Sequence, residues 1–141
     1  MTINPKQRRI ARERALQFLF GLDFTAYEWL AAIDAFWREN PSKPSVREYA
    51  ETLIRGVFEY RVELDTAIDS ALTGWTPERV ARVERNILRV ALYEIRHVAG
   101  MPTKVAINEA VEVAKRFGAD DAPRFVNAVL DRLAIPANAE S

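Results

Sequence analysis

Basic side chains of the kind that bind phosphate are concentrated at the start of the chain. The first fourteen residues carry five cations and one acid, Glu13, although the 141-residue chain has a formal net charge of zero. The cations are Lys6, Arg8, Arg9, Arg12 and Arg14. A charge-free apolar run, residues 15–22, follows directly. The pattern predicts one helix whose second half docks into a core, while the basic arm, residues 5–14, contacts a polyanion.

The chemistry of such an arm is electrostatic. Each Lys or Arg that neutralises a phosphate releases condensed counterions, and arginine can also stack on bases. Four to five such contacts on single-stranded RNA predict a log-log salt slope of about −3 to −3.5. The residues alone support equally well the alternative that these arginines are solvated and paired with acids elsewhere.

Most catalytic and metal sites need residues that this sequence lacks. It has no cysteine, one histidine (His97) and five glycines that form no phosphate-binding loop. The adjacent carboxylates Asp120 and Asp121 precede an expected helix start, where capping explains them. We therefore expect no enzymatic activity, no metal and no cofactor.

The composition is typical of one globular domain. Apolar residues make up 49% of the chain and charged residues 28%, and its length suffices to bury a core. No apolar run approaches the ~20 residues that span a bilayer, and the chain does not open with a secretory signal pattern. We expect a cytoplasmic protein that does not contact membranes.

Capping signals divide the chain into six or seven helices, with no convincing strand. Helix starts are predicted by a capping box at Asn4, by further boxes at Thr25 and Ser45, and by Thr76-Pro77. The later helices are expected over about 81–99, 103–117 and 122–134, the last capped by Asp121 and ended by Pro136. These signals predict an all-α, single-domain bundle over residues 1–135 and a loose tail over 136–141.

A few side chains are unusual for their place on these helices. Glu84 lies within the apolar arc of its helix, so it either satisfies backbone donors of the first turn or meets a basic residue of a partner. Phe20 points away from the core side of the first helix, toward a partner or RNA. Phe125, one turn into the last helix, is placed to stack on a base. Three tryptophans are expected to pack in the core or between helices: Trp29, Trp37 and Trp75.

Four blocks of the sequence resemble the bacterial NusB transcription antitermination family. They are residues 8–17, 53–57 with 63–65, 83–89 with 91–94, and 105–118 with 125–127. The blocks keep the order and spacing of the family over nearly the whole chain, and residues 23–45 are the least similar. Phe20 stands where the family often has tyrosine, and Ala128 where it usually has glycine. The chain lacks the length and glycine-rich loop of the rRNA methyltransferases that carry a related domain, so it resembles the stand-alone factor.

The resemblance implies an all-helical fold, binding to the boxA element of nascent single-stranded RNA, and a heterodimer with the small-subunit ribosomal protein NusE. That pair would join other Nus factors on RNA polymerase at ribosomal RNA operons. Separately, homodimerisation would be able to cover an apolar patch that is left exposed when the partner is absent. The implied RNA-binding residues are Lys6, Arg8, Arg9, Arg12, Arg89, Asp121 and Phe125. The implied partner-binding residues are Phe20 and Glu84.

Two other functions fit the residues less well. The first alternative is a non-enzymatic helical adaptor whose basic arm binds an acidic protein. Helix-turn-helix DNA binding is the poorer alternative, because the arginines lie in the first helix rather than in a recognition helix after a short turn.

Overall fold

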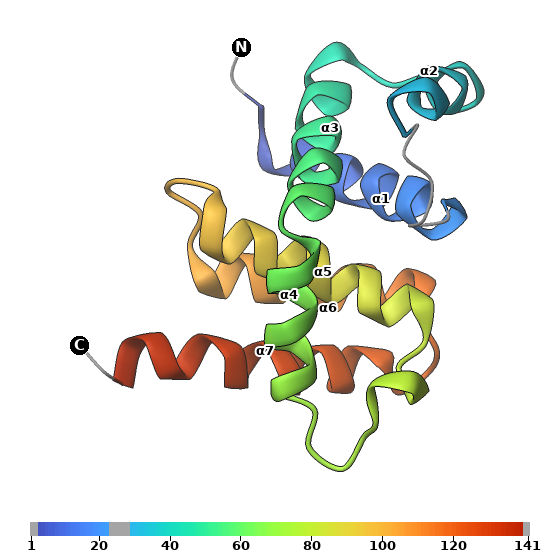
Figure 1. The fold of residues 1–141 in the computed structure, drawn as a ribbon. Coiled ribbons are helices and arrows are strands. Elements are labelled where there is room, and N and C mark those ends of the chain that lie inside the picture. The colour runs from blue at the N-terminus through green and yellow to red at the C-terminus, as the bar shows by residue number, and fades with distance from the viewer. Residues whose placement is uncertain (1–2, 23–28, 140–141) are drawn as a thin grey trace.

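A computed structural model describes residues 3–22 and 29–139, with the side chains of 3–22 and 29–134. Within these residues the chain forms seven α-helices, one short 3-10 helix and no strand (Figure 1). The α-helices are α1 (Pro5–Gly21), α2 (Trp29–Glu39), α3 (Pro44–Glu59), α4 (Arg61–Ser70), α5 (Arg82–His97), α6 (Thr103–Phe117) and α7 (Ala122–Ala139). The 3-10 helix η1 is Pro77–Arg79. The predicted all-α fold is confirmed.

The helices form two groups that share one central helix. Helices α1 to α3 make up one end of the molecule and α4 to α7 the other, with α3 and α4 running almost end to end (Figure 1). Helix α5 packs against α1, α3, α4, α6 and α7, and eight of its sixteen residues are buried. Since three of those eight are Asn86, Arg89 and Glu94, the core contains polar groups that need partners.

The first helix begins as its sequence predicts. The Asn4 side chain accepts a hydrogen bond from the Gln7 backbone N–H at 2.8 Å, and the Gln7 side chain accepts one from the Asn4 N–H at 3.1 Å. Pro5 occupies the first helical position, where its missing N–H has no cost. This capping box fixes the residue at which the helix of the basic arm begins.

Other helix ends differ from the sequence predictions. Ser45 does not cap α3: Lys43 is the cap residue, Pro44 takes the first helical position, and Ser45 is buried in the first turn. Thr76-Pro77 starts only the short η1, and α5 begins separately at Arg82. The predicted capping box at Thr25 lies outside the described residues.

The last helix is longer than predicted. Helix α7 continues through Pro136 to Ala139, so the residues expected to begin a loose tail are helical. An internal proline removes one helical hydrogen bond, but alanines at 134, 137 and 139 favour continuation.

Glycines shape both ends of α6. Gly100, with φ at +77°, adopts the left-handed conformation in the turn that joins α5 to α6. Helix α6 then spans the predicted residues and is closed by Gly118. A Cβ at Gly118 would lie 2.5 Å from the Cβ of Ala122, so only glycine permits this tight entry into α7.

Two of the three tryptophans are packed as predicted, and the third is nearly half exposed. Trp37 is in the core, and Trp29 stacks on Phe58 with 5.6 Å between ring centroids. Trp75, expected in the core or between helices, contacts the Phe125 ring of α7, but 45% of it is exposed because it lies in the turn before η1. No helix in the described residues combines the length and apolar character that crossing a bilayer requires.

Candidate nucleic-acid interface

The basic arm has one exposed cation that is already paired. Arg9 donates from Nε and Nη2 to the two carboxylate oxygens of Glu109 on α6, at 2.9 and 2.7 Å. These hydrogen bonds, and the positive charge of Arg9, lower the pKa of Glu109. The Arg9 side chain remains 50% exposed, whereas Glu109 is mostly covered. Arg9 therefore stays accessible, but an acid offsets most of its charge.

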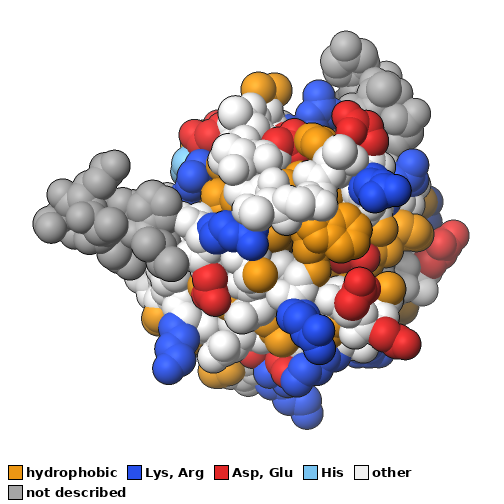
Figure 2. Space-filling view, turned by 90° about the horizontal axis from the view of Figure 1, so that it is seen from below, with side chains coloured by type: hydrophobic (Ala, Val, Ile, Leu, Met, Phe, Trp, Pro, Cys, Tyr) orange, Lys and Arg blue, Asp and Glu red, His pale blue; other side chains and the backbone are white. Residues whose placement is uncertain are grey.

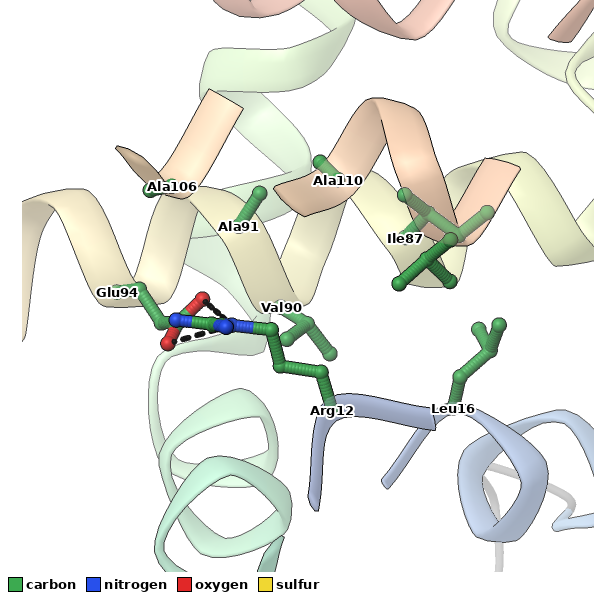
Figure 3. Close-up of a pocket in the computed structure, with 9 residues that line it drawn as sticks. Arg12, Leu16, Ile87, Val90, Ala91, Glu94, Ala106 and Ala110 are labelled. Carbon is green, nitrogen blue, oxygen red and sulfur yellow. Dashed lines mark hydrogen bonds and ion pairs between the residues drawn. The ribbon is translucent and has the colours of Figure 1, made fainter. Parts of the chain in front are cut away.

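Arg12 is buried rather than presented at the surface. Its Nε lies 2.9 Å from Oε1 of Glu94 on α5 (Figure 3). Its Nη1 lies 3.3 Å from Oε1 of Glu109 on α6. Tyr49 of α3 donates its hydroxyl proton to Glu94. Only 5% of the Arg12 side chain and 1% of that of Glu94 are exposed. The sequence placed Arg12 among the cations offered to RNA; the structure shows its guanidinium committed to the core.

Burial and pairing act in opposite directions on this ion pair. Burial alone would lower the pKa of Arg12, but its hydrogen bonds and attraction to Glu94 outweigh that effect and raise the pKa. The space beside the pair, lined by Leu16, Ile87 and Ala110, measures about 10 Å³. That volume admits at most one water molecule, so the gap is not a ligand site.

The remaining arm cations have no acidic partner in the described residues. Lys6 is exposed and makes no ion pair there. The Arg8 guanidinium lies 5.3 Å from the ring centroid of Tyr49, and its buried Nε has no hydrogen-bond acceptor. Arg14 hydrogen-bonds only to the neutral side chains of Gln17, Asn40 and Ser42. The uncompensated positive charge of α1 therefore belongs to Lys6, Arg8 and Arg14.

Arg89 also points inward, contrary to its expected place on a phosphate track. It donates from Nε and Nη2 to Asp65 of α4, at 2.7 and 2.8 Å, and from Nη1 to Asn86 at 3.0 Å. Arg85 is similarly covered, and its Nη2 lies 2.8 Å from Oδ1 of Asp69. These arginines tie α5 to α4, which explains why they are unavailable at the surface.

Three predicted site residues meet in one groove between η1, α5 and α7. Glu84, Asp121 and Phe125 line a groove of about 150 Å³ together with Trp75. The Trp75 and Phe125 rings are 5.5 Å apart. Glu84 is half-buried, and its carboxylate makes no hydrogen bond or ion pair within the described part of the chain. In the view of the molecule from the η1 and α7 side, hydrophobic side chains reach the surface among charged ones (Figure 2).

Phe20 lies at the exposed end of α1, on the side that its helical position predicts. It is 45% exposed, and the Arg82 guanidinium lies 5.9 Å from its ring centroid. An aromatic ring beside a cation at the surface suits a contact with a partner molecule.

Sequence reasoning missed two residues that the fold brings to these surfaces. Trp75 lines the groove of Glu84, and Lys43 lines a groove beside Lys6 and Arg14. Both lie in connections between helices, where no helical period predicts which side a residue faces. The one feature of the sequence that could have pointed to Trp75 was its position directly before the predicted helix start at Thr76-Pro77. Among the described residues, no cluster of acids and histidine could hold a metal ion.

The fold and surface define a small helical bundle with a basic first helix and a groove between η1, α5 and α7 that holds aromatic, acidic and one basic side chain. A model of the NusB family matches residues 9–134. The transcription antitermination protein NusB of Geobacter sulfurreducens is 44% identical over 128 residues, covering 90% of this chain and 93% of that protein. The chain belongs to the NusB family.

Solved structures agree with this assignment. A Thermotoga maritima (T. maritima) NusB structure superposes with a TM-score of 0.75 at 32% identity, covering 95% of this chain and 92% of that one. A crystal structure of NusB and NusE in complex with double-stranded RNA contains a chain that superposes with a TM-score of 0.81. That chain is 24% identical and the match covers 92% and 97% of the two chains, so it shows a shared fold.

Proposed function

We propose that this protein is a transcription antitermination factor that binds boxA-type single-stranded RNA as a heterodimer with a NusE-type ribosomal protein. Family membership supports the antitermination role, and a chain of the same fold has been crystallised with NusE and RNA. The pair would help assemble a complex on RNA polymerase at ribosomal RNA operons, with the protein acting by positioning RNA rather than by catalysis.

The observation that carries the RNA part is the uncompensated charge on α1. Lys6, Arg8 and Arg14 have no acidic partner in the described residues, whereas Arg9 and Arg12 do. At roughly 0.7 per phosphate contact, three free cations give a log-log salt slope of about −2, shallower than the sequence suggested. Arg12 contributes indirectly, because its buried ion pair holds α1 against α5.

The proposed partner surface combines Phe20 of α1 with Glu84 of α5. Phe20 offers an exposed ring, and Glu84 an unpaired, half-buried carboxylate beside Trp75. Such a carboxylate gains most from a cation that arrives on a partner and excludes water. We assign Phe20 and Glu84 to the NusE-type protein, and Phe125 with Asp121 to RNA near the same groove.

The test is fluorescence anisotropy with a boxA RNA and a scrambled RNA, each with and without the NusE-type protein, at two salt concentrations. We expect preference for boxA, a gain when the partner is added, and a loss at higher salt. Arg8→Gln should weaken RNA binding more than Arg9→Gln, because Arg9 is already neutralised by Glu109. Equal, weak binding to both RNAs that ignores the partner would instead support the adaptor function.

A further inference from the structure

A groove runs between the start of α1 and the loop that joins α2 to α3. Its volume is about 440 Å³, within the range of about 300–1,000 Å³ typical of ligand clefts. One wall is formed by Lys6, Ile10 and Arg14 of α1. The other is formed by Pro41, Ser42, Lys43 and Val46. The groove is separate from the Glu84 groove and shares no residue with it.

The charge of this groove is of one sign. Lys6, Arg14 and Lys43 line it, and none of its lining residues is acidic. None of the three makes an ion pair in the described residues. Lys43 caps α3 through its backbone position alone, without a side-chain hydrogen bond, so its ammonium group is available. The first turn of α3 adds the partial positive charge of a helix N-terminus to the same wall.

The loop wall is held in place by the arm itself. Arg14 donates from Nε to the Ser42 hydroxyl and from Nη1 to the Asn40 side chain, each at 3.2 Å. The Ser42 hydroxyl donates to the Asn40 carbonyl at 3.1 Å. Because both partners of Arg14 are neutral, these bonds fix the groove without cancelling its charge.

The groove also presents apolar surface to a ligand. Ile10 is 36% exposed, and Pro41 is exposed on the facing loop. Apolar side chains beside cations suit a nucleotide, because its phosphate needs the cations and its base needs a dry face.

We infer that this groove binds one nucleotide of the RNA next to those held by the arm, with its phosphate at Lys6 and Lys43 and its base against Ile10 and Pro41. This inference rests on the proposed function, and it is supported by charge complementarity and by continuity with the arm through Lys6 and Arg14. Pro41, Ser42 and Lys43 belong to the region least similar to the family, so the groove would give this chain a contact of its own.

The first test is Lys43→Gln compared with Lys115→Gln, which removes the same charge from an exposed position on α6. Anisotropy with the boxA RNA should show a loss of about three- to tenfold for Lys43→Gln, with a salt slope shallower by about 0.7. Lys115→Gln should remain within about twofold of the wild type. Circular dichroism melting of each variant confirms that the fold is intact.

The second test locates the RNA in the wild-type protein. The boxA RNA is synthesised with 4-thiouridine at one position at a time, cross-linked by light, and mapped by mass spectrometry. We expect one position to cross-link within residues 39–47. If wild-type protein binds no RNA, the proposed function and the groove both fall.

The outcomes distinguish failure of the groove assignment from failure of the proposed RNA-binding function. If wild-type protein binds RNA, while Lys43→Gln matches Lys115→Gln and no cross-link maps to residues 39–47, the groove assignment alone is overturned. The same holds if Lys43→Gln weakens binding of the protein partner and leaves RNA affinity unchanged, because the groove then contacts protein.

Discussion

Arg12 of α1 and Glu94 of α5 form a buried ion pair across 82 positions of sequence, with 2.9 Å between Nε and Oε1. Tyr49 of α3 completes the pair by donating to the same carboxylate. Three helices therefore meet at one charge centre in the core. Arg12 belongs to the basic arm, so the arm is held in position by the buried guanidinium of one of its own residues.

The first prediction concerns stability. Arg12→Ala should lower the free energy of unfolding by about 3–5 kcal/mol, because Glu94 is left buried and uncompensated. Arg9→Ala breaks a half-exposed pair and should cost about 1 kcal/mol or less. Urea unfolding followed by circular dichroism measures both variants. An Arg12→Ala protein as stable as Arg9→Ala would contradict the structural role assigned to Arg12.

The second prediction is a pH dependence from Glu109. Its pKa is lowered in the folded state, first by the hydrogen bonds from Arg9. A lowered pKa gives stabilisation that is fully present above the ordinary value of 4.5 and is lost as pH falls through the folded pKa. The difference in unfolding free energy between wild type and Glu109→Gln should therefore shrink as pH falls below about 4.5.

The control for this prediction is the same comparison in an Arg9→Gln background. Since the Arg9 hydrogen bonds are the largest cause of the shift, the pH dependence of the difference should be smaller there. An unchanged dependence in that background would show that Arg9 does not set the pKa of Glu109.

The sequence predicted where the helices lie better than it predicted which arginines are left without an acidic partner. Capping signals and helical periods are local, so the start of α1 and the span of α6 were predictable. Pairing is not local: Arg9 meets Glu109 across 100 positions, and Arg89 meets Asp65 across 24. Only tertiary packing decides which arginines of a basic segment keep a free charge.

Residues between helices were the hardest to predict. Lys43 and Trp75 lie in or beside connections, where side-chain direction depends on the turn rather than on a repeating period. The helical continuation through Pro136 likewise depends on the balance between one lost hydrogen bond and its alanine neighbours. Local sequence rules favour ending the helix at that proline, and here the structure differs.

The third prediction tests a close contact between α3 and α5. A Cβ at Gly56 of α3 would lie 2.1 Å from Cζ of Tyr93 on α5. Gly56→Ala should therefore displace the Tyr93 ring from its contact with α3 and lower the free energy of unfolding by about 1–3 kcal/mol. At Gly21, the last residue of α1, an added Cβ meets nothing within 4 Å.

Gly21→Ala is thus the matched control, and it should leave stability unchanged or raise it by up to about 1 kcal/mol. Thermal or urea unfolding of the two variants provides the comparison. If both alanines had the same effect, the contact between Gly56 and Tyr93 would not be the reason for glycine in α3.

The last prediction addresses the partner surface. Phe20→Ala should weaken binding of the NusE-type protein by tenfold or more, in the range of an aromatic hot spot of about 2 kcal/mol. Because the ring is 45% exposed, the stability of the free protein should change by about 0.5 kcal/mol or less. Phe20→Tyr, which restores the residue frequent in the family, should bind at least as well as the wild type. Leu30→Ala on α2, 63% exposed, is the control for loss of apolar surface elsewhere. Isothermal titration calorimetry measures all three, and equal affinity for Phe20→Ala and Leu30→Ala would place the partner on another face.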